Sequence, residues 1–194
     1  MIKQSDILIS GVGGQGTLLA SRIIGGVAIK NGCDVKVSEV HGMSQRGGSV
    51  TTYVRFSDKT VFSPILDPGR ADIVLAFEIL EAYRSVSYLK EGGFMIINAQ
   101  EIRPMPVITG EAELPNDIVK KINGFGIKTS VLDAGALAKK AGSIRAANLV
   151  LIGKLSRLFD FPKAEWIDTI QESVKPDFVN INIKAFELGY ADIS

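Results

Sequence analysis

A glycine-rich segment near the start of the chain, GVGGQG at residues 11–16, matches the spacing G-x-G-x-x-G. It follows a short apolar run and precedes a helical pattern, and in this context the spacing marks a phosphate-binding turn. Backbone N–H groups and the positive end of the following helix then face an anion. The pattern predicts a nucleotide-like phosphate site, and a purely structural glycine turn is the alternative. The candidate cofactor-binding residues are Gly11, Gly13, Gly14, Gln15, Gly16 and Thr17.

A second polar segment, HGMSQRGGS at residues 41–49, contains the only histidine of the sequence, His41. Any histidine-dependent catalysis must use this residue, so His41 is the candidate catalytic residue and a structural histidine is the alternative. Arg46 offers a forked donor for a phosphate or carboxylate, or a salt bridge at a subunit contact. The candidate substrate or interface loop comprises His41, Gly42, Met43, Ser44, Gln45, Arg46, Gly47, Gly48 and Ser49.

Several other chemistries are excluded by residue type. One histidine and one cysteine, Cys33, are too few for a multi-histidine metal site, a four-cysteine zinc or iron–sulfur site, or a disulfide within the chain. A serine-hydrolase elbow around Ser44 would need glycine where Arg46 stands. Glu39 lies near the expected ribose-binding position, but no Tyr-Lys or His-Asp arrangement supports an NAD(P) dehydrogenase.

Charge and hydropathy narrow the class further. With 22 Lys and Arg against 21 Asp and Glu, the net charge is +1. The chain therefore lacks the excess of positive charge that is typical of general nucleic-acid or anionic-membrane binders. No stretch approaches the roughly 18 apolar residues that cross a bilayer, and the first residues do not read as a signal peptide. We therefore expect a cytoplasmic protein with no nucleic-acid or membrane partner.

The two polar segments must be positioned by strands. Alternating strand and helix patterns predict a single Rossmann-like α/β domain over residues 1–194, with an open, mainly parallel sheet and C-terminal helices. A right-handed crossover between the first two strands places both segments at the carboxyl edge of the sheet, so we expect them to be neighbours. Strands are expected at residues 6–10, 34–40, 50–56, 71–77, 94–98 and 126–133, and helices at 17–31, 78–90, 134–140, 148–159, 163–174 and 180–190.

Four segments, GVGGQGTLLAS, EVHGMSQRGGSV, ADIVLAFEILEA and NIKAFELGY, resemble the gamma-type subunits of 2-oxoacid:ferredoxin oxidoreductases. The resemblance spans nearly the whole chain and is strongest to the indolepyruvate branch of that family. Pyruvate and 2-oxoglutarate branches share the fold and much of the first motif. Two alternatives from other classes stay open: an adenylating enzyme of the ubiquitin-activating type and a non-catalytic nucleotide-binding module.

The resemblance implies an oxidative decarboxylation in which coenzyme A, as co-substrate, takes the acyl group and ferredoxin takes the electrons. Thiamine diphosphate, magnesium and 4Fe-4S clusters are expected on a large partner subunit. The chain lacks both the cysteines for a cluster and the Gly-Asp-Gly stretch that opens a thiamine diphosphate site. We expect this chain to hold no metal or cofactor alone, to be inactive alone, and to complete the enzyme at a subunit interface. Self-association of the isolated chain stays open.

Overall fold

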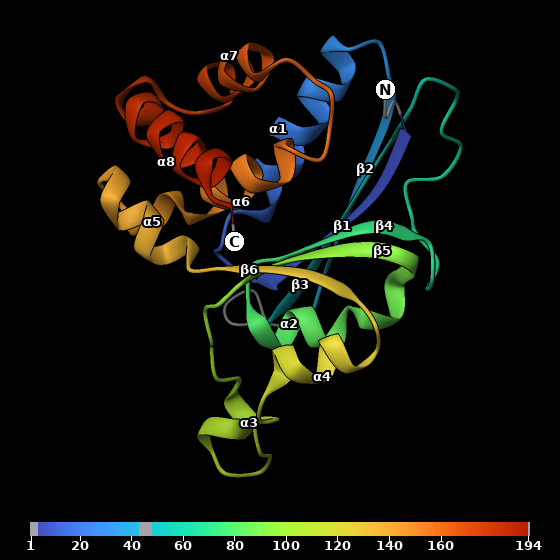
Figure 1. Ribbon diagram of the computed structural model, residues 1–194, viewed down its shortest axis with the longest axis vertical. Coiled ribbons are helices and arrows are strands. Elements are labelled where there is room, and N and C mark those ends of the chain that lie inside the picture. The colour runs from blue at the N-terminus through green and yellow to red at the C-terminus, as the bar shows by residue number, and fades with distance from the viewer. Residues whose placement is uncertain (1–3, 43–47, 194) are drawn as a thin grey trace.

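The computed structural model describes residues 4–42 and 48–193, and within these ranges six strands form one sheet in the order β2-β3-β1-β4-β5-β6 (Figure 1). The strands are β1 (Gln4–Val12), β2 (Asp34–His41), β3 (Ser49–Ser57), β4 (Ala71–Ala76), β5 (Leu89–Asn98) and β6 (Lys128–Leu132). The helices are α1 (Thr17–Lys30), α2 (Ile79–Arg84), α3 (Met105–Ile108), α4 (Ile118–Gly124), α5 (Ala134–Ala141), α6 (Ala147–Ser156), α7 (Lys163–Ser173) and α8 (Val179–Ala191).

The expected α/β fold with a mainly parallel sheet and C-terminal helices is confirmed. β1, β4, β5 and β6 pair in parallel, while β3 runs antiparallel between β1 and β2. The first two strands do run in the same direction, as expected, but they are not neighbours because β3 lies between them. Their carboxyl ends therefore still lie at one edge of the sheet.

Helices cover both faces of the sheet. On one face, Ile7 and Ile9 of β1 pack in a core formed with α1, α5, α6, α7 and α8; on the other face, Leu8 packs with residues of α2 and α4. All three side chains are fully buried. Burial on both faces explains why β1 is a continuous apolar run rather than an alternating one. Cys33 is buried, as expected of a small apolar thiol.

Two glycines let α6 and α8 approach closely. A Cβ added at Gly153 would lie 2.0 Å from the carbonyl oxygen of Phe186, and one at Gly189 would lie 1.9 Å from that of Val150. The helices thus meet backbone to backbone, which only glycine permits. This crossing fixes α6 on the sheet and, with it, the residues at the amino end of α6.

The expected helix over residues 78–90 is too long. α2 ends at Arg84, a short 3-10 turn follows over Val86–Tyr88, and β5 begins at Leu89. Residues 91–93, which separate the expected helix from the expected strand at 94–98, lie inside β5. Leu89 pairs with Ala71 of β4, and Lys90 forms an ion pair with Asp72, so tertiary pairing extends this segment. No helix in the described part of the chain is long and apolar enough to cross a membrane.

Candidate functional site

The glycine turn joins β1 to α1 at the carboxyl edge of the sheet. The backbone N–H of Gly13 donates to the carbonyl of Gly48 at 3.0 Å, so the turn and the end of the second polar segment are neighbours, as expected. Gly14 and Gly16 have φ values of +97° and +85°, in the left-handed region that favours glycine. The remaining predicted loop residues, Met43, Ser44, Gln45, Arg46 and Gly47, lie outside the described residues.

Gln15 braces the turn with its side chain. Its Oε1 accepts from the backbone N–H of Val12 at 2.7 Å, while its Nε2 donates to the carbonyl of Phe77 at 3.1 Å and to Oε1 of Gln100 at 3.2 Å. These bonds tie the turn to the end of β4. Among the described residues, no acceptor is in hydrogen-bonding range of the backbone N–H groups of Gly14 and Gly16. Neither N–H group is therefore used by the described part of the fold.

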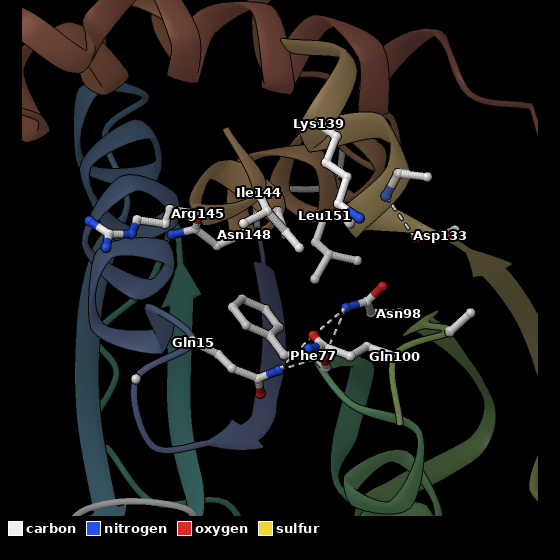
Figure 2. A pocket seen from close by; sticks show the side chains of 15 residues that line it. Gln15, Phe77, Asn98, Gln100, Asp133, Lys139, Ile144, Arg145, Asn148 and Leu151 are labelled. Carbon is white, nitrogen blue, oxygen red and sulfur yellow. Dashed lines mark hydrogen bonds between the residues drawn. The ribbon is translucent and has the colours of Figure 1, made fainter. Parts of the chain in front are cut away.

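A cleft of about 630 Å³ opens beside this turn, between the carboxyl ends of the parallel strands and the starts of α5 and α6 (Figure 2). Ligands of open α/β sheets bind in this position. The residues that line it are Gly14, Gln15, Phe77, Asn98, Ala99, Gln100, Asp133, Gly135, Ala136, Lys139, Ile144, Arg145, Ala147, Asn148 and Leu151.

Asn148, at the start of α6, connects the cleft to the glycine turn. The residue is 6% exposed, and its Oδ1 accepts from the N–H of Leu149 at 3.0 Å, whereas Nδ2 has no acceptor among the described residues. A Cβ on Gly16 would lie 2.6 Å from this Nδ2. An unpaired amide donor beside two unpaired backbone donors is an arrangement suited to an anion.

Asn98 and Asp133 hold the wall of the cleft in place. Asn98 donates from Nδ2 to the carbonyl of Phe77 at 3.0 Å and accepts at Oδ1 from the N–H of Ala134 at 3.1 Å. Asp133 caps α5 by accepting from the N–H of Ala136 at 2.8 Å. These hydrogen bonds position the start of α5 against the end of β5.

Two cations stand at the cleft without carboxylate partners among the described residues: Lys139 and Arg145, both exposed. Figure 2 shows the ammonium of Lys139 reaching into the cleft from α5, while the guanidinium of Arg145 extends to the other side of the view. The positive charges are therefore spread along the opening. This arrangement suits an elongated ligand that carries more than one negative group.

Glu39 does not occupy the role of a free ribose-binding carboxylate. Its Oε2 accepts from Oγ1 of Thr17 at 3.2 Å and of Thr52 at 3.0 Å, and its Oε1 contacts Nε2 of His41. The side chain of Glu39 is 8% exposed and that of His41 is 58% exposed. Thr17 therefore lies beside the glycine turn with its hydroxyl bonded to Glu39, and His41 is oriented from β2.

Two buried carboxyl groups, those of Glu78 at the N-cap of α2 and Glu81 within α2, lie near the start of β3. Glu81 bonds to Oγ of Ser49 through Oε2 and to Arg84 at 2.6 Å through Oε1, which anchors the start of β3. Glu78 accepts from the N–H groups of Glu81 at 2.9 Å and Ile102 at 3.0 Å. Burial raises the pKa of Glu78 above the ordinary glutamate value, despite these hydrogen bonds. Ser49 is thus a structural member of the predicted loop.

The described residues include no group of three or more His, Cys, Asp and Glu placed to hold a metal ion. The cleft is lined by the cations Lys139 and Arg145 and by amide donors, beside the carboxylate of Asp133 that caps α5. The cations and donors fit phosphate or carboxylate ligands. Sequence analysis missed Lys139, Arg145 and Asn148. They lie in a helical stretch far from both glycine-rich segments and belong to no spaced motif, so only the folded chain brings them to the turn.

The sheet, the glycine turn and the cleft define a Rossmann-like α/β domain whose carboxyl edge carries donors and cations suited to an anion. The chain belongs to the pyruvate ferredoxin/flavodoxin oxidoreductase family, whose model matches residues 6–191. This confirms the family resemblance seen in the sequence.

Curated relatives and a solved structure agree with this assignment. The chain is 46% identical to the indolepyruvate oxidoreductase subunit IorB of Thermococcus kodakarensis, over 97% of this chain and 95% of that protein. It is 25% identical to the gamma subunit common to pyruvate and ketoisovalerate oxidoreductases of the same organism, over 89% and 86% of the two chains. The keto/oxoacid ferredoxin oxidoreductase gamma subunit of Geobacter sulfurreducens superposes with a TM-score of 0.71 at 25% identity, covering 96% of each chain.

Proposed function

We propose that this chain is the small subunit of an indolepyruvate:ferredoxin oxidoreductase. The enzyme would decarboxylate indolepyruvate or a related aryl pyruvate oxidatively, transfer the acyl group to coenzyme A and pass two electrons to ferredoxin. The observation that carries this proposal is the contrast between two relatives from one organism, with 46% identity to the indolepyruvate subunit and 25% to the pyruvate and ketoisovalerate subunit. Gamma subunits of pyruvate or 2-oxoglutarate enzymes are the alternative within the family.

The same proposal divides the work between two subunits. Thiamine diphosphate, magnesium and the 4Fe-4S clusters belong to a larger companion subunit, because one cysteine in this sequence cannot ligate a cluster. This chain is then inactive alone and completes the enzyme on assembly. Its action in the cytoplasm and the self-association of the isolated chain stay predictions.

The role proposed for this chain is to bind coenzyme A. The nucleotide part of that molecule carries a diphosphate and a separate 3′-phosphate, which matches the spread of positive charge from Lys139 to Arg145. Asn148 Nδ2 and the N–H groups of Gly14 and Gly16 add uncharged donors suited to phosphate oxygens. The cleft adjoins the glycine turn, one of the two glycine-rich segments that are candidates for contact with coenzyme A.

The test is to express this chain with and without the larger companion subunit of the same complex. The complex should co-purify, contain iron and thiamine diphosphate, and reduce ferredoxin when both indolepyruvate and coenzyme A are present. We expect kcat/KM for indolepyruvate to exceed that for pyruvate, ketoisovalerate or 2-oxoglutarate by roughly 10- to 200-fold, the range one hydrophobic pocket provides. A preference for pyruvate or 2-oxoglutarate would contradict the substrate assignment. Tight ATP binding without assembly would favour an adenylating enzyme or a nucleotide-binding module.

A further inference from the structure

His41 and Glu39 form an ion pair in which the carboxylate is buried and fixed by hydrogen bonds while the imidazole is exposed. Both lie on the same face of β2, two residues apart, so the carboxylate lies directly beside the imidazole. Glu39 is buried and held by the hydroxyls of Thr17 and Thr52 from two other elements, α1 and β3. The carboxylate is thus fixed in place, and the imidazole it contacts through Nε2 remains mostly exposed.

The pair lies at the same edge of the sheet as the glycine turn. In the strand register His41 is opposite Val50, and Val50 is opposite Gly11, so His41 and Gly11 lie two strand spacings apart, about 10 Å. Glu39 also contacts Thr17, the first residue after the turn. The cleft that holds Asn148 and Lys139 lies on the other side of the turn. An elongated molecule bound in the cleft can therefore cross the turn and bring its far end to His41.

We propose that His41 is the proton acceptor for the thiol of the co-substrate and that Glu39 is its positioning residue; this inference rests on the proposed function. With Nε2 bound to Glu39, the free Nδ1 takes the proton as the S–H bond breaks, which leaves a thiolate and an imidazolium stabilised by the carboxylate. The thiolate sulfur forms the new bond to the acyl carbon presented by the companion subunit, while the bond between that carbon and its carrier on the companion subunit breaks and the carrier keeps the electron pair. The imidazolium then releases its proton to solvent, and the electrons leave through the enzyme's own ferredoxin step.

The charged surroundings of His41 are simple in the described part of the chain. Glu39 is its ion-pair partner on β2, and the residues of β3 nearest to it in register, Val50 and Thr52, are uncharged. Arg22 is the charged residue in the first half of α1, and it is exposed without an ion pair among the described residues. Substituting Glu39 therefore changes the ion-pair partner of His41 within the described residues, and Arg22→Gln is the control for charge on α1.

Two substitutions test the proposal in the assembled complex. His41→Gln removes the proton acceptor. Glu39→Gln keeps the size of the side chain and leaves an oxygen that accepts from Thr17 and Thr52. The new amide NH₂ donates to Nε2 of His41, so the imidazole proton moves to Nδ1. Protonated Nδ1 can no longer accept the proton of the thiol. Glu113→Gln, at an exposed carboxylate outside the cleft, is the matched control.

We expect His41→Gln and Glu39→Gln each to lower kcat/KM for coenzyme A by roughly 10²- to 10⁴-fold, the usual contribution of general acid–base catalysis. The kcat/KM for indolepyruvate reports the steps before the thiol reacts, so in the same variants it should change by less than about threefold. The deficit should shrink as pH rises towards the thiol pKa of about 8.5, because solvent then supplies the thiolate. Arg22→Gln and Glu113→Gln should behave like wild type.

Four results would overturn the proposal. The first is an unchanged kcat/KM for coenzyme A in His41→Gln. The second and third are an equal loss of kcat/KM for both substrates and a loss of subunit assembly, either of which would make the pair structural. The fourth is a loss of kcat/KM for coenzyme A that does not depend on pH. A wild-type complex that does not oxidise indolepyruvate or any other 2-oxoacid would instead refute the proposed function, so the two failures are distinguishable.

Discussion

The amide nitrogen of Asn148 lies directly over Gly16, so close that a Cβ on the glycine would be 2.6 Å from it. The two residues are far apart in sequence and come from the starts of α6 and α1. Their contact closes the glycine turn on the side of the cleft, where unpaired backbone and side-chain donors gather. The strength of anion binding therefore depends on how accurately α6 is placed against this turn.

Gly16→Ala should disturb this contact, and Gly32→Ala provides a matched control. Both glycines have positive φ, +85° and +80°, but nothing lies within 4 Å of a Cβ at Gly32. Each change should therefore cost about 1–2 kcal/mol of unfolding free energy from backbone strain. Only Gly16→Ala should also push Asn148 aside and weaken coenzyme A binding. Calorimetric titration of the assembled complex measures the difference, and equal binding by both variants would exclude a role for the contact.

Lys139→Ala and Arg145→Ala should each raise the Kd of the complex for coenzyme A. For exposed cations a loss of about 1 kcal/mol each, or roughly fivefold, is expected. Pantetheine, the thiol fragment without phosphates, should react equally with wild type and both variants. Lys140→Ala changes an exposed neighbour on α5 that does not line the cleft, so it serves as the control. If Lys140→Ala weakened binding as much as Lys139→Ala, the effect would be one of overall charge.

The α6–α8 crossing should be the least tolerant place for an added methyl group. Gly189→Ala would put a Cβ 1.9 Å from the carbonyl oxygen of Val150, a clash with backbone that no rotamer relieves. We expect a loss of at least about 3 kcal/mol of unfolding free energy, the upper end for overpacking. Gly124→Ala, at the end of α4 with open space around its Cβ, should change stability little. Chemical denaturation of both variants checks this, and similar midpoints would contradict the close crossing.

Glu78 should make stability fall with rising pH. Its folded pKa is raised by burial above the ordinary value of 4.5, so the folded state binds more protons than the unfolded state between the two values. The stabilisation is present below the unfolded pKa and is lost as pH rises through the folded pKa. Relative to Glu78→Gln, the wild type should therefore lose unfolding free energy over this window. Denaturation of both proteins at a series of pH values measures this change, and a wild type that gains unfolding free energy relative to Glu78→Gln as pH rises would contradict the prediction.

Local patterns predict the glycine turn and the C-terminal helices well. The conformation of the turn depends on neighbouring residues, and a helix such as α8 is predicted by the spacing of apolar residues within one segment. The position of β3 between β1 and β2 was not predicted. A third strand that folds back between two parallel strands has the same local sequence pattern as a strand added elsewhere in the sheet. The end of α2 was misjudged for the same reason: residues 85–90 follow strand pairing with β4, which is a tertiary contact.

The candidate site also has features that the sequence predicts and features that only the folded chain reveals. Gly13 and Gly48 were expected to be neighbours because both follow from strand direction, and their hydrogen bond confirms it. Glu39 was recognised by its position after strand two, yet its bonds to Thr17 and Thr52 depend on side-chain rotamers that no sequence spacing encodes. Asn148 was missed because its unpaired amide has meaning only once α6 lies against the glycine turn.

The most direct measurement is the rate of ferredoxin reduction by the companion subunit as a function of coenzyme A concentration, with and without this chain. In the presence of indolepyruvate, adding this chain should produce turnover that saturates with coenzyme A, and substituting Lys139 and Arg145 together should raise the KM for coenzyme A by roughly 25-fold if their effects add. A companion subunit that shows the same turnover and the same KM for coenzyme A without this chain would contradict the account.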